Sequence, residues 1–352
     1  MKKIVFTFLG LFFLLPFQIQ ATKRPQNVVI MIGDGMGLAQ IYAGMVVNGN
    51  HLQFERFKSI GFSKTYSANN FTTDSGAGGT AIACGVKTNN YMIGMNPDST
   101  KAESILEVAK KHKLSTGVVV ACALTHATPA DFIAHQPNRN MYEEIAADYL
   151  NSGVDVAIGG GRKYFEERND DRNITAELKS KGYKIASSLD EVKNQQDGKV
   201  IGLLYEDQVP AVPARGKMLP ESAVAALNIL DNNKKGFVLM VEGSQIDWAC
   251  HDNNAEQLTK EMLDFDETVG KVLDYAQVHK NTLVIVTADH ETGGLTMPGG
   301  DMKRGTFNAV FSIKGHSGVL VPVFTFGPGA DEFQGFMENS SFKTKIEKLL
   351  KF

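Results

Sequence analysis

The sequence contains few cysteines, and their number is odd. There are three, Cys84, Cys122 and Cys250, each in a small or apolar setting, and no two form a CxxC pair. A disulfide framework normally uses an even set of cysteines, and cysteine-based zinc sites normally use such pairs. We therefore predict three buried free thiols, with neither disulfides nor a cysteine metal site.

The chain also lacks an excess of charge of either sign. Its 36 lysines and arginines nearly balance its 39 aspartates and glutamates, which gives a formal net charge of −3. No block of like charge, no low-complexity tract and no internal repeat occurs. Without a basic field, the protein is not expected to have a nucleic-acid partner or to bind an anionic membrane.

Long apolar runs are rare, and the clear one lies at the N-terminus. Residues 4–17 are almost entirely apolar, follow a basic start and precede a short polar exit that ends at Ala21. This pattern is typical of a secretory signal peptide, and the run is shorter than the roughly 20 residues of a membrane-spanning helix. We predict that residues 1–21 are cleaved after Ala21 and that the protein is secreted or periplasmic with no stable membrane anchor. An uncleaved anchor is the weaker alternative.

The remaining residues, 22–352, read as one α/β domain without a linker. Short apolar, β-rich runs alternate with segments of helical periodicity, which favours a mostly parallel sheet covered by helices on both faces. We predict a single three-layer α/β/α domain with a large central sheet. The strands are expected at residues 27–32, 116–121, 154–158, 237–241, 282–287 and 319–326, and the main helices at 102–112, 141–150 and 255–276.

Polar side chains follow several of these strands directly. Asp34, residues 125–128, Glu242 and the pair Asp289-His290 all come at strand ends. Ligands of parallel sheets bind beyond the carboxyl ends of the strands. We therefore expect these residues to lie together at one edge of the sheet.

Three histidines point to a metal centre. Asp247 and His251 are four residues apart, so one helical turn would place them on the same face, where they form either a surface pair or two ligands of one ion. His290 adjoins Asp289, and His316 lies between glycines. Mixed histidine and carboxylate ligands suit catalytic zinc, whereas oxygen ligands alone suit magnesium, and both kinds are present.

The stretch Thr73–Ala81 places one hydroxyl, Ser75, before a run of very small residues. Such a helix start suits an anion, although a Gly-rich loop with a capping serine is the plain alternative. Arg139 could grip a tetrahedral oxyanion with its two-pronged guanidinium, although a surface arginine is the simpler interpretation from its position.

Taken together, these stretches resemble the alkaline phosphatase family, and the resemblance covers about residues 27–327. Five stretches match in the family's order: Gly33-Asp34-Gly35-Met36-Gly37; Thr73-Asp74-Ser75 through Thr88; Thr125–Ala130 with Arg139; Glu242–Asp247 with His251; and Asp289–Gly294 with Gly315–Gly318.

The resemblance implies a phosphomonoesterase that hydrolyses small-molecule phosphate monoesters through a covalent phosphoserine at Ser75. Arg139 would hold the phosphoryl oxygens, and Asp74 would orient Arg139. Two zinc ions and one magnesium ion are implied: the first zinc held by Asp247, His251 and His316, the second by Asp34, Asp289 and His290 with Ser75, and the magnesium by Asp34, Thr128 and Glu242.

Two positions vary within the family. His126 and Trp248 stand where some members carry an acid and a lysine. The resemblance therefore implies a histidine near the magnesium site, and an aromatic wall at Trp248 in place of a water-mediated positive contact to phosphate. The family also implies a homodimer. Two alternatives remain at this point: a phosphodiesterase on the same scaffold, and a non-catalytic phosphate- or metal-binding protein.

Overall fold

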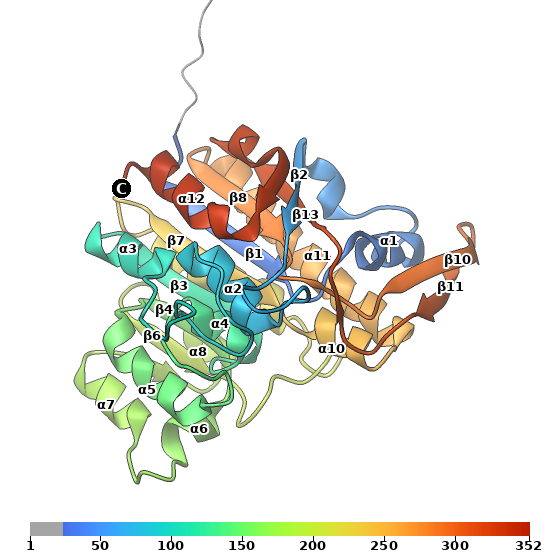
Figure 1. Ribbon diagram of the computed structural model, residues 1–352. Helices are drawn as coiled ribbons and strands as arrows, with labels where there is room; N and C mark the ends of the chain where they lie inside the picture. The colour runs from blue at the N-terminus through green and yellow to red at the C-terminus, as the bar shows by residue number, and fades with distance from the viewer. Residues whose placement is uncertain (1–23) are drawn as a thin grey trace, which may run out of the picture.

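A computed structural model describes residues 24–352, and its centre is one sheet of ten strands (Figure 1). The predicted signal peptide, residues 1–21, lies outside the described residues. Within this sheet β13 alone runs against the other strands. In sheet order the strands are β14 (Gly335–Glu338), β2 (Ser59–Lys64), β13 (Val321–Phe326), β8 (Thr282–Thr287), β1 (Asn27–Gly33), β7 (Phe237–Gly243), β3 (Ser115–Ala123), β4 (Val156–Gly160), β6 (Val200–Leu203) and β5 (Lys184–Ala186).

Helices cover both faces of the sheet. Successive side chains of a strand point to opposite faces, and the central strands are apolar on both, so each face needs a covering layer. In β1, Val29 and Met31 pack into one apolar core, while Val28 and Ile30 pack into the other. The first core is closed by α1 (Leu38–Val47), α8 (Leu189–Lys193), α9 (Met218–Leu230), α10 (Gln245–His251) and α11 (Ala255–Val278). The second is closed by α2 (Ser75–Cys84), α3 (Ile105–Lys111), α5 (Tyr142–Ser152), α6 (Arg162–Glu166), α7 (Ile174–Ser180) and α12 (Phe342–Leu350).

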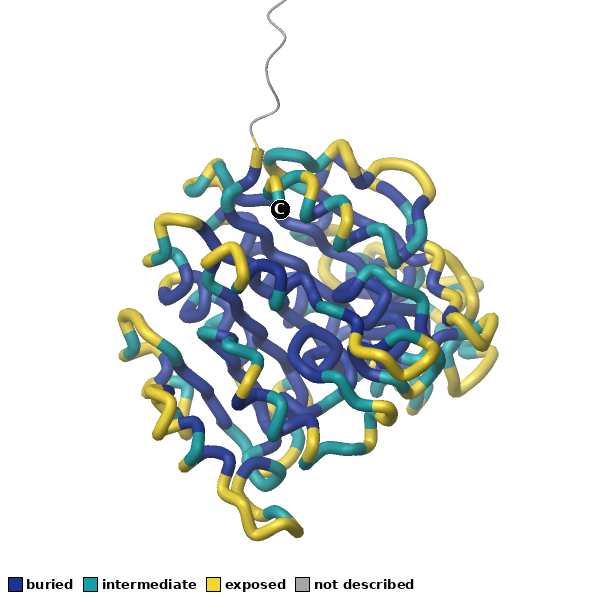
Figure 2. Tube along the Cα trace, turned by 60° about the vertical axis from the view of Figure 1, so that its left-hand side comes forward, coloured by how far each residue is buried: buried dark blue, intermediate teal, exposed yellow. Residues whose placement is uncertain are grey.

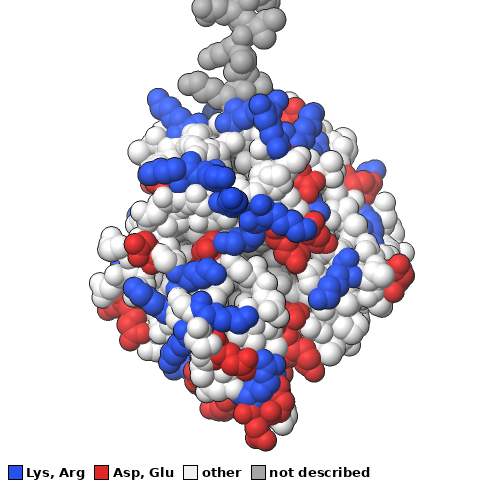
Figure 3. All heavy atoms as spheres, turned by 90° about the vertical axis from the view of Figure 1, so that its left-hand side faces the viewer, with Lys and Arg blue, Asp and Glu red and all other residues white. Residues whose placement is uncertain are grey.

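This arrangement confirms the predicted three-layer α/β/α architecture. Figure 2 shows the buried strands running through the middle of the molecule, with exposed segments confined to its periphery. The three cysteines are buried free thiols, as predicted. Among residues 24–352, no helix has the length and apolar character needed to cross a bilayer. On the face shown in Figure 3, basic and acidic side chains are interspersed, in keeping with the balanced composition.

Some elements fall outside the predicted alternation. β10 (Leu295–Asp301) and β11 (Thr306–Phe311) form a separate hairpin, and β9 (Glu291–Thr292) pairs with β12 (His316–Ser317). These strands are too short or too exposed to show as apolar runs. Further short elements are α4 (Ala127–Asp131), η1 (Gln53–Arg56), η2 (Ala330–Phe333) and η3 (Asn339–Ser341).

The register of the central strands aligns their carboxyl ends. Gly33 of β1 lies opposite Gly243 of β7, and Ile32 lies opposite Thr287 of β8. Asp34 and Glu242 are therefore neighbours at one edge of the sheet. The helix α4 follows β3 and lies beside α2, which completes the platform for the site.

Candidate active site

Ser75 is the first residue of α2, and its Oγ lies 3.2 Å from Nε2 of His290. The helix begins here because Asp74 is extended and its Oδ1 accepts a hydrogen bond from the backbone N–H of Ala77 at 3.0 Å. Every residue of α2 is buried. Small residues let the helix approach the sheet closely: a Cβ at Gly78 would lie 3.1 Å from Cβ of Asp289.

Asp247, His251 and His316 form the first group with metal-ligand geometry. Asp247 and His251 both lie on α10, so the predicted helical turn is confirmed. Nε2 of His251 lies 3.2 Å from Asp247 Oδ1, and Nε2 of His316 lies 3.5 Å from the same oxygen. Each Nδ1 faces a backbone carbonyl, that of Lys314 for His251 and that of Thr73 for His316. These second contacts direct both Nε2 atoms at one point, as ligating imidazoles require.

Asp34, Asp289 and His290 form the second group, which adjoins Ser75 through His290. Nε2 of His290 lies 3.0 Å from Asp289 Oδ2 and 3.5 Å from Asp34 Oδ1. All three side chains are completely buried. Asp34 directly follows β1, and Asp289 and His290 follow β8. These two strands are adjacent and parallel, so they bring distant parts of the sequence together.

The third group lies next to Asp34. Oγ1 of Thr128 on α4 lies 3.5 Å from Asp34 Oδ2, and Glu242 is fully buried at the end of β7. His126 and Cys122 share this third group with Glu242, and Cys122 Sγ lies 3.5 Å from Glu242 Oε2. Cys122 is the member that the sequence did not place at the site, because its apolar surroundings in β3 indicate a core thiol.

Two further predicted residues flank these groups. Arg139 is largely buried, and its Nη1 donates to Asp74 Oδ2 at 2.9 Å. Asp74 thus both caps the Ser75 helix and holds the guanidinium. Trp248 stands edge-on to the ring of His126, with the ring centroids 5.6 Å apart.

Comparison with known proteins identifies the family. The sequence model of the family described as alkaline phosphatase matches residues 25–312. Alkaline phosphatase 4 of Bacillus subtilis is 32% identical over 93% of this chain and 89% of its own length. The chain belongs to the alkaline phosphatase family. Alkaline phosphatase 3 of the same species is 36% identical over 77% of this chain, which spans 62% of that protein.

Solved structures of this family share the fold over nearly the whole chain. The alkaline phosphatase of the Antarctic bacterium TAB5 superposes with a TM-score of 0.89 at 40% identity, covering 94% of this chain and 99% of that one. The cold-active enzyme of a Shewanella species gives 0.87 at 32% identity, covering 92% and 99%. Alkaline phosphatases are metal-dependent and act on small-molecule phosphate monoesters, so the chain is a phosphoric monoester hydrolase. The phosphodiesterase and non-catalytic alternatives are not favoured.

This alkaline phosphatase site contains several buried carboxylates whose negative charge requires cations. Asp34 Oδ1, Glu242 Oε1 and Asp289 Oδ2 are buried and make no hydrogen bond within the described part of the chain, and His290 is the one histidine there that lies close to the two aspartate oxygens. Burial, reinforced by the Asp289 carboxylate, raises the pKa of Asp34 well above its usual value, and burial raises that of Glu242 to about 7. So many buried carboxylates repel one another unless positive charge lies between them, and metal ions supply it. The donor set therefore fits divalent cations.

Residues outside the predicted set complete the alkaline phosphatase site. Thr292 Oγ1 contacts Asp247 Oδ1 and lies 3.2 Å from Nδ1 of His290, so it links the first two groups. Glu291 accepts hydrogen bonds from Gln40 Nε2 at 2.7 Å and from Ser317 Oγ, which fixes β9 against β12. Both follow Asp289-His290 directly in the sequence, and that adjacency is the signal that could have found them.

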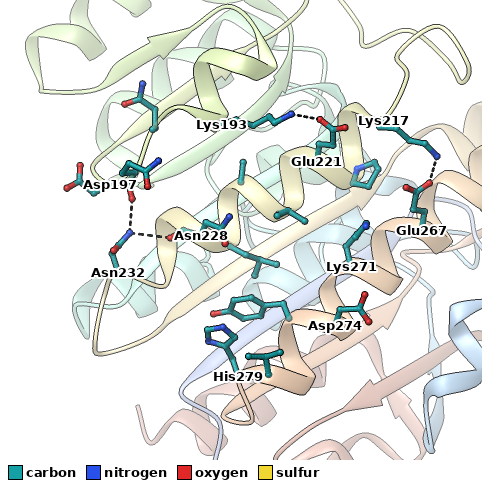
Figure 4. A pocket seen from close by; sticks show the side chains of 18 residues that line it. Lys193, Asp197, Lys217, Glu221, Asn228, Asn232, Glu267, Lys271, Asp274 and His279 are labelled. Carbon is teal, nitrogen blue, oxygen red and sulfur yellow. Dashed lines mark hydrogen bonds and ion pairs between the residues drawn. The ribbon is translucent and has the colours of Figure 1, made fainter.

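A separate cavity of about 1000 Å³ lies between α9 and α11, and none of the site residues line it (Figure 4). Ion pairs cross its rim, from Lys193 to Glu221 and from Lys217 to Glu267. This cavity is therefore separate from the candidate active site, which we locate from the polar atoms that converge at the strand ends.

The packing of α2 predicts a large effect for Gly79→Ala. A Cβ at Gly79 would lie 2.1 Å from Asp131 Oδ2, and Oδ1 of that carboxyl is held by Thr80 Oγ1 at 2.8 Å. We expect the variant to lower the free energy of unfolding by about 1–3 kcal/mol, measured by urea denaturation. The same substitution in an Asp131→Ala background should cost less, because the clashing carboxyl is gone; an equal cost in both backgrounds would contradict this account.

Proposed function

We propose that Ser75 Oγ attacks the phosphorus atom of a phosphate monoester and forms a covalent phosphoserine. One observation carries this assignment. The hydroxyl of Ser75 stands at the start of a buried helix, 3.2 Å from His290, where both histidine–carboxylate groups converge. An unassisted serine is a weak nucleophile near neutral pH. Histidine–carboxylate groups of this kind can activate the hydroxyl of Ser75.

We further propose the ions that each group holds. Asp247, His251 and His316 suit one zinc ion, and Asp34, Asp289 and His290 suit a second, with Ser75 as its neighbour. The oxygens of Asp34, Thr128 and Glu242 suit magnesium, which a histidine-to-glutamate variant of the TAB5 enzyme holds. When bound, such ions lower the pKa of a serine hydroxyl and neutralise charge on the leaving oxygen.

The protein's own groups position the phosphoryl oxygens. The Arg139 guanidinium, held by Asp74, offers two parallel N–H groups to two of these oxygens, and the free N–H groups at the start of α2 face the same charge. As the P–O bond to Ser75 forms, the bond to the alcohol breaks. Water then displaces Ser75 at phosphorus and releases inorganic phosphate, so two inversions give net retention.

The direct test is hydrolysis of 4-nitrophenyl phosphate at alkaline pH with zinc and magnesium present. We expect turnover that exceeds hydrolysis of bis(4-nitrophenyl) phosphate, because a diester offers fewer free oxygens to Arg139. Absence of turnover in protein shown to contain its metals would overturn the proposal.

Arg139→Ala should lower kcat/KM for 4-nitrophenyl phosphate by roughly 10²- to 10³-fold, because a charged donor to the transferred group is lost. The loss for the diester should be smaller. Arg172→Ala is the matched control, since Arg172 is exposed and pairs only with Glu177 among the ion pairs of the described residues. Equal losses on monoester and diester would argue against the role of Arg139.

We also propose that residues 1–21 are a signal peptide, that residues 22–352 form the catalytic domain of a secreted or periplasmic protein, and that the enzyme is a homodimer. The basic start and apolar run support the first point, and the family's habit supports the last. N-terminal sequencing of exported protein should begin at Thr22, and light scattering should give twice the chain mass. An intact Met1 or a monomer mass would contradict these proposals.

A further inference from the structure

The two zinc-ligand groups differ in exposure. The side chains of Asp34 and His290 are completely buried, whereas the side chain of His251 is 37% exposed. The site therefore opens to solvent beside His251 and His316. With Ser75 attacking in line from the buried side, the alcohol part of the ester must leave through this opening.

Phe71 packs against the segment that carries His316. It lies in the loop between β2 and α2, four residues before Ser75, and is 78% exposed. Its ring packs over Gly318, where a Cβ would lie 2.3 Å from the ring atom Cε1. Gly318 follows His316 by two residues, and Nδ1 of His316 is 2.8 Å from the carbonyl oxygen of Thr73. The ring of Phe71 thus packs on the same segment that carries His316, a member of the more exposed ligand group.

The loop that carries Phe71 is held rigidly by asparagines. Asn70 Oδ1 accepts from the Thr72 N–H at 3.0 Å, and Asn90 Nδ2 donates to the Thr72 carbonyl at 3.0 Å. Asn90 Oδ1 also accepts from the Asp74 N–H at 3.3 Å. Because these bonds hold the backbone next to Phe71, little backbone entropy is lost when an apolar group packs on its ring.

We propose that Phe71 is a specificity-determining residue: its ring receives the apolar or aromatic part of the alcohol in the phosphate ester. The enzyme then prefers esters of aryl-bearing alcohols over esters of small polar alcohols. This inference rests on the proposed function, because it takes the direction of the leaving alcohol from the attack by Ser75.

The test compares 2-phenylethyl phosphate with ethyl phosphate, two primary alkyl esters that differ by the aromatic ring. In the holoenzyme we expect the ratio of their kcat/KM values to favour the phenylethyl ester, and Phe71→Ala to lower this ratio by roughly two- to tenfold. Phe71→Trp should keep it. Inhibition by inorganic phosphate should stay unchanged in Phe71→Ala, since phosphate has no alcohol part.

Phe336→Ala is the matched control, because Phe336 is 71% exposed on β14 at the edge of the sheet and should leave the ratio unchanged. An unchanged ratio in Phe71→Ala would overturn the inference. So would a changed ratio accompanied by a lower mass in light scattering, which would assign Phe71 to a subunit contact. If the unmodified protein hydrolyses neither ester, the proposed function itself fails.

Discussion

Ser75→Ala is expected to lower kcat for 4-nitrophenyl phosphate by roughly a thousandfold or more, because it removes the proposed nucleophile of the two-step reaction. The ligand groups do not depend on the serine hydroxyl for their shape. His290 keeps Asp289 Oδ2 at 3.0 Å, and Asp74 still caps α2 through the Ala77 N–H. Metal content and stability should therefore remain close to those of the unmodified protein.

The measurement combines steady-state kinetics, metal analysis by mass spectrometry and thermal unfolding. Ser180→Ala serves as control, since Ser180 is an exposed serine near the end of α7 whose hydroxyl bonds only locally, to the Glu177 carbonyl. Retention of most activity by Ser75→Ala would exclude this serine as nucleophile. Loss of activity together with loss of metal would leave the serine with a structural role only.

Removal of metal should have the second large effect, on stability as well as on activity. Asp34, Asp289 and Glu242 each have a buried oxygen that makes no hydrogen bond within residues 24–352. Without metal ions, these carboxyl groups must therefore take up protons or repel one another. A ligand present at a thousand times its dissociation constant stabilises the native state by about 4 kcal/mol. Exhaustive chelation is therefore expected to abolish turnover and to lower Tm by about 10 °C.

Calorimetry before and after chelation checks this, with zinc plus magnesium added back to restore both properties. Asp247→Ala provides the matched variant. Burial opposes ionisation of Asp247, but its hydrogen bond with His251 and the charges of His290 and His316 hold its pKa below the usual range. Without that carboxylate, the difference in Tm between metal-loaded and metal-free protein should shrink. Metal-free protein with unchanged activity would contradict the metal assignment.

The sequence predicted the positions of those site residues that directly follow a strand. Asp34, Glu242 and Asp289 each follow an apolar run, and parallel strands bring their carboxyl ends together, so their proximity follows from local pattern plus one topological rule. Helical spacing predicted that Asp247 and His251 share one face of a helix, and it left open whether they bind one ion. Assignment of the ions and of Ser75 came from the resemblance to the family, and remains a proposal for this chain.

The remaining features depend on packing that no local pattern reveals. Cys122 is one apolar position among several in β3, and only the register of β3 beside β7 places its thiol on Glu242. Asp131 looks like a helix-end carboxylate, yet Gly79 gives it room in the interior. The β10–β11 hairpin has an alternating, largely exposed surface, which short polar strands share with loops.

The central claim is that phosphate is carried by one serine at the start of α2. Enzyme incubated with radiolabelled inorganic phosphate at acidic pH, quenched and digested, should yield one labelled peptide that contains Ser75, and Ser75→Ala should yield none. Label on any other residue, or turnover without a labelled peptide, would contradict the account.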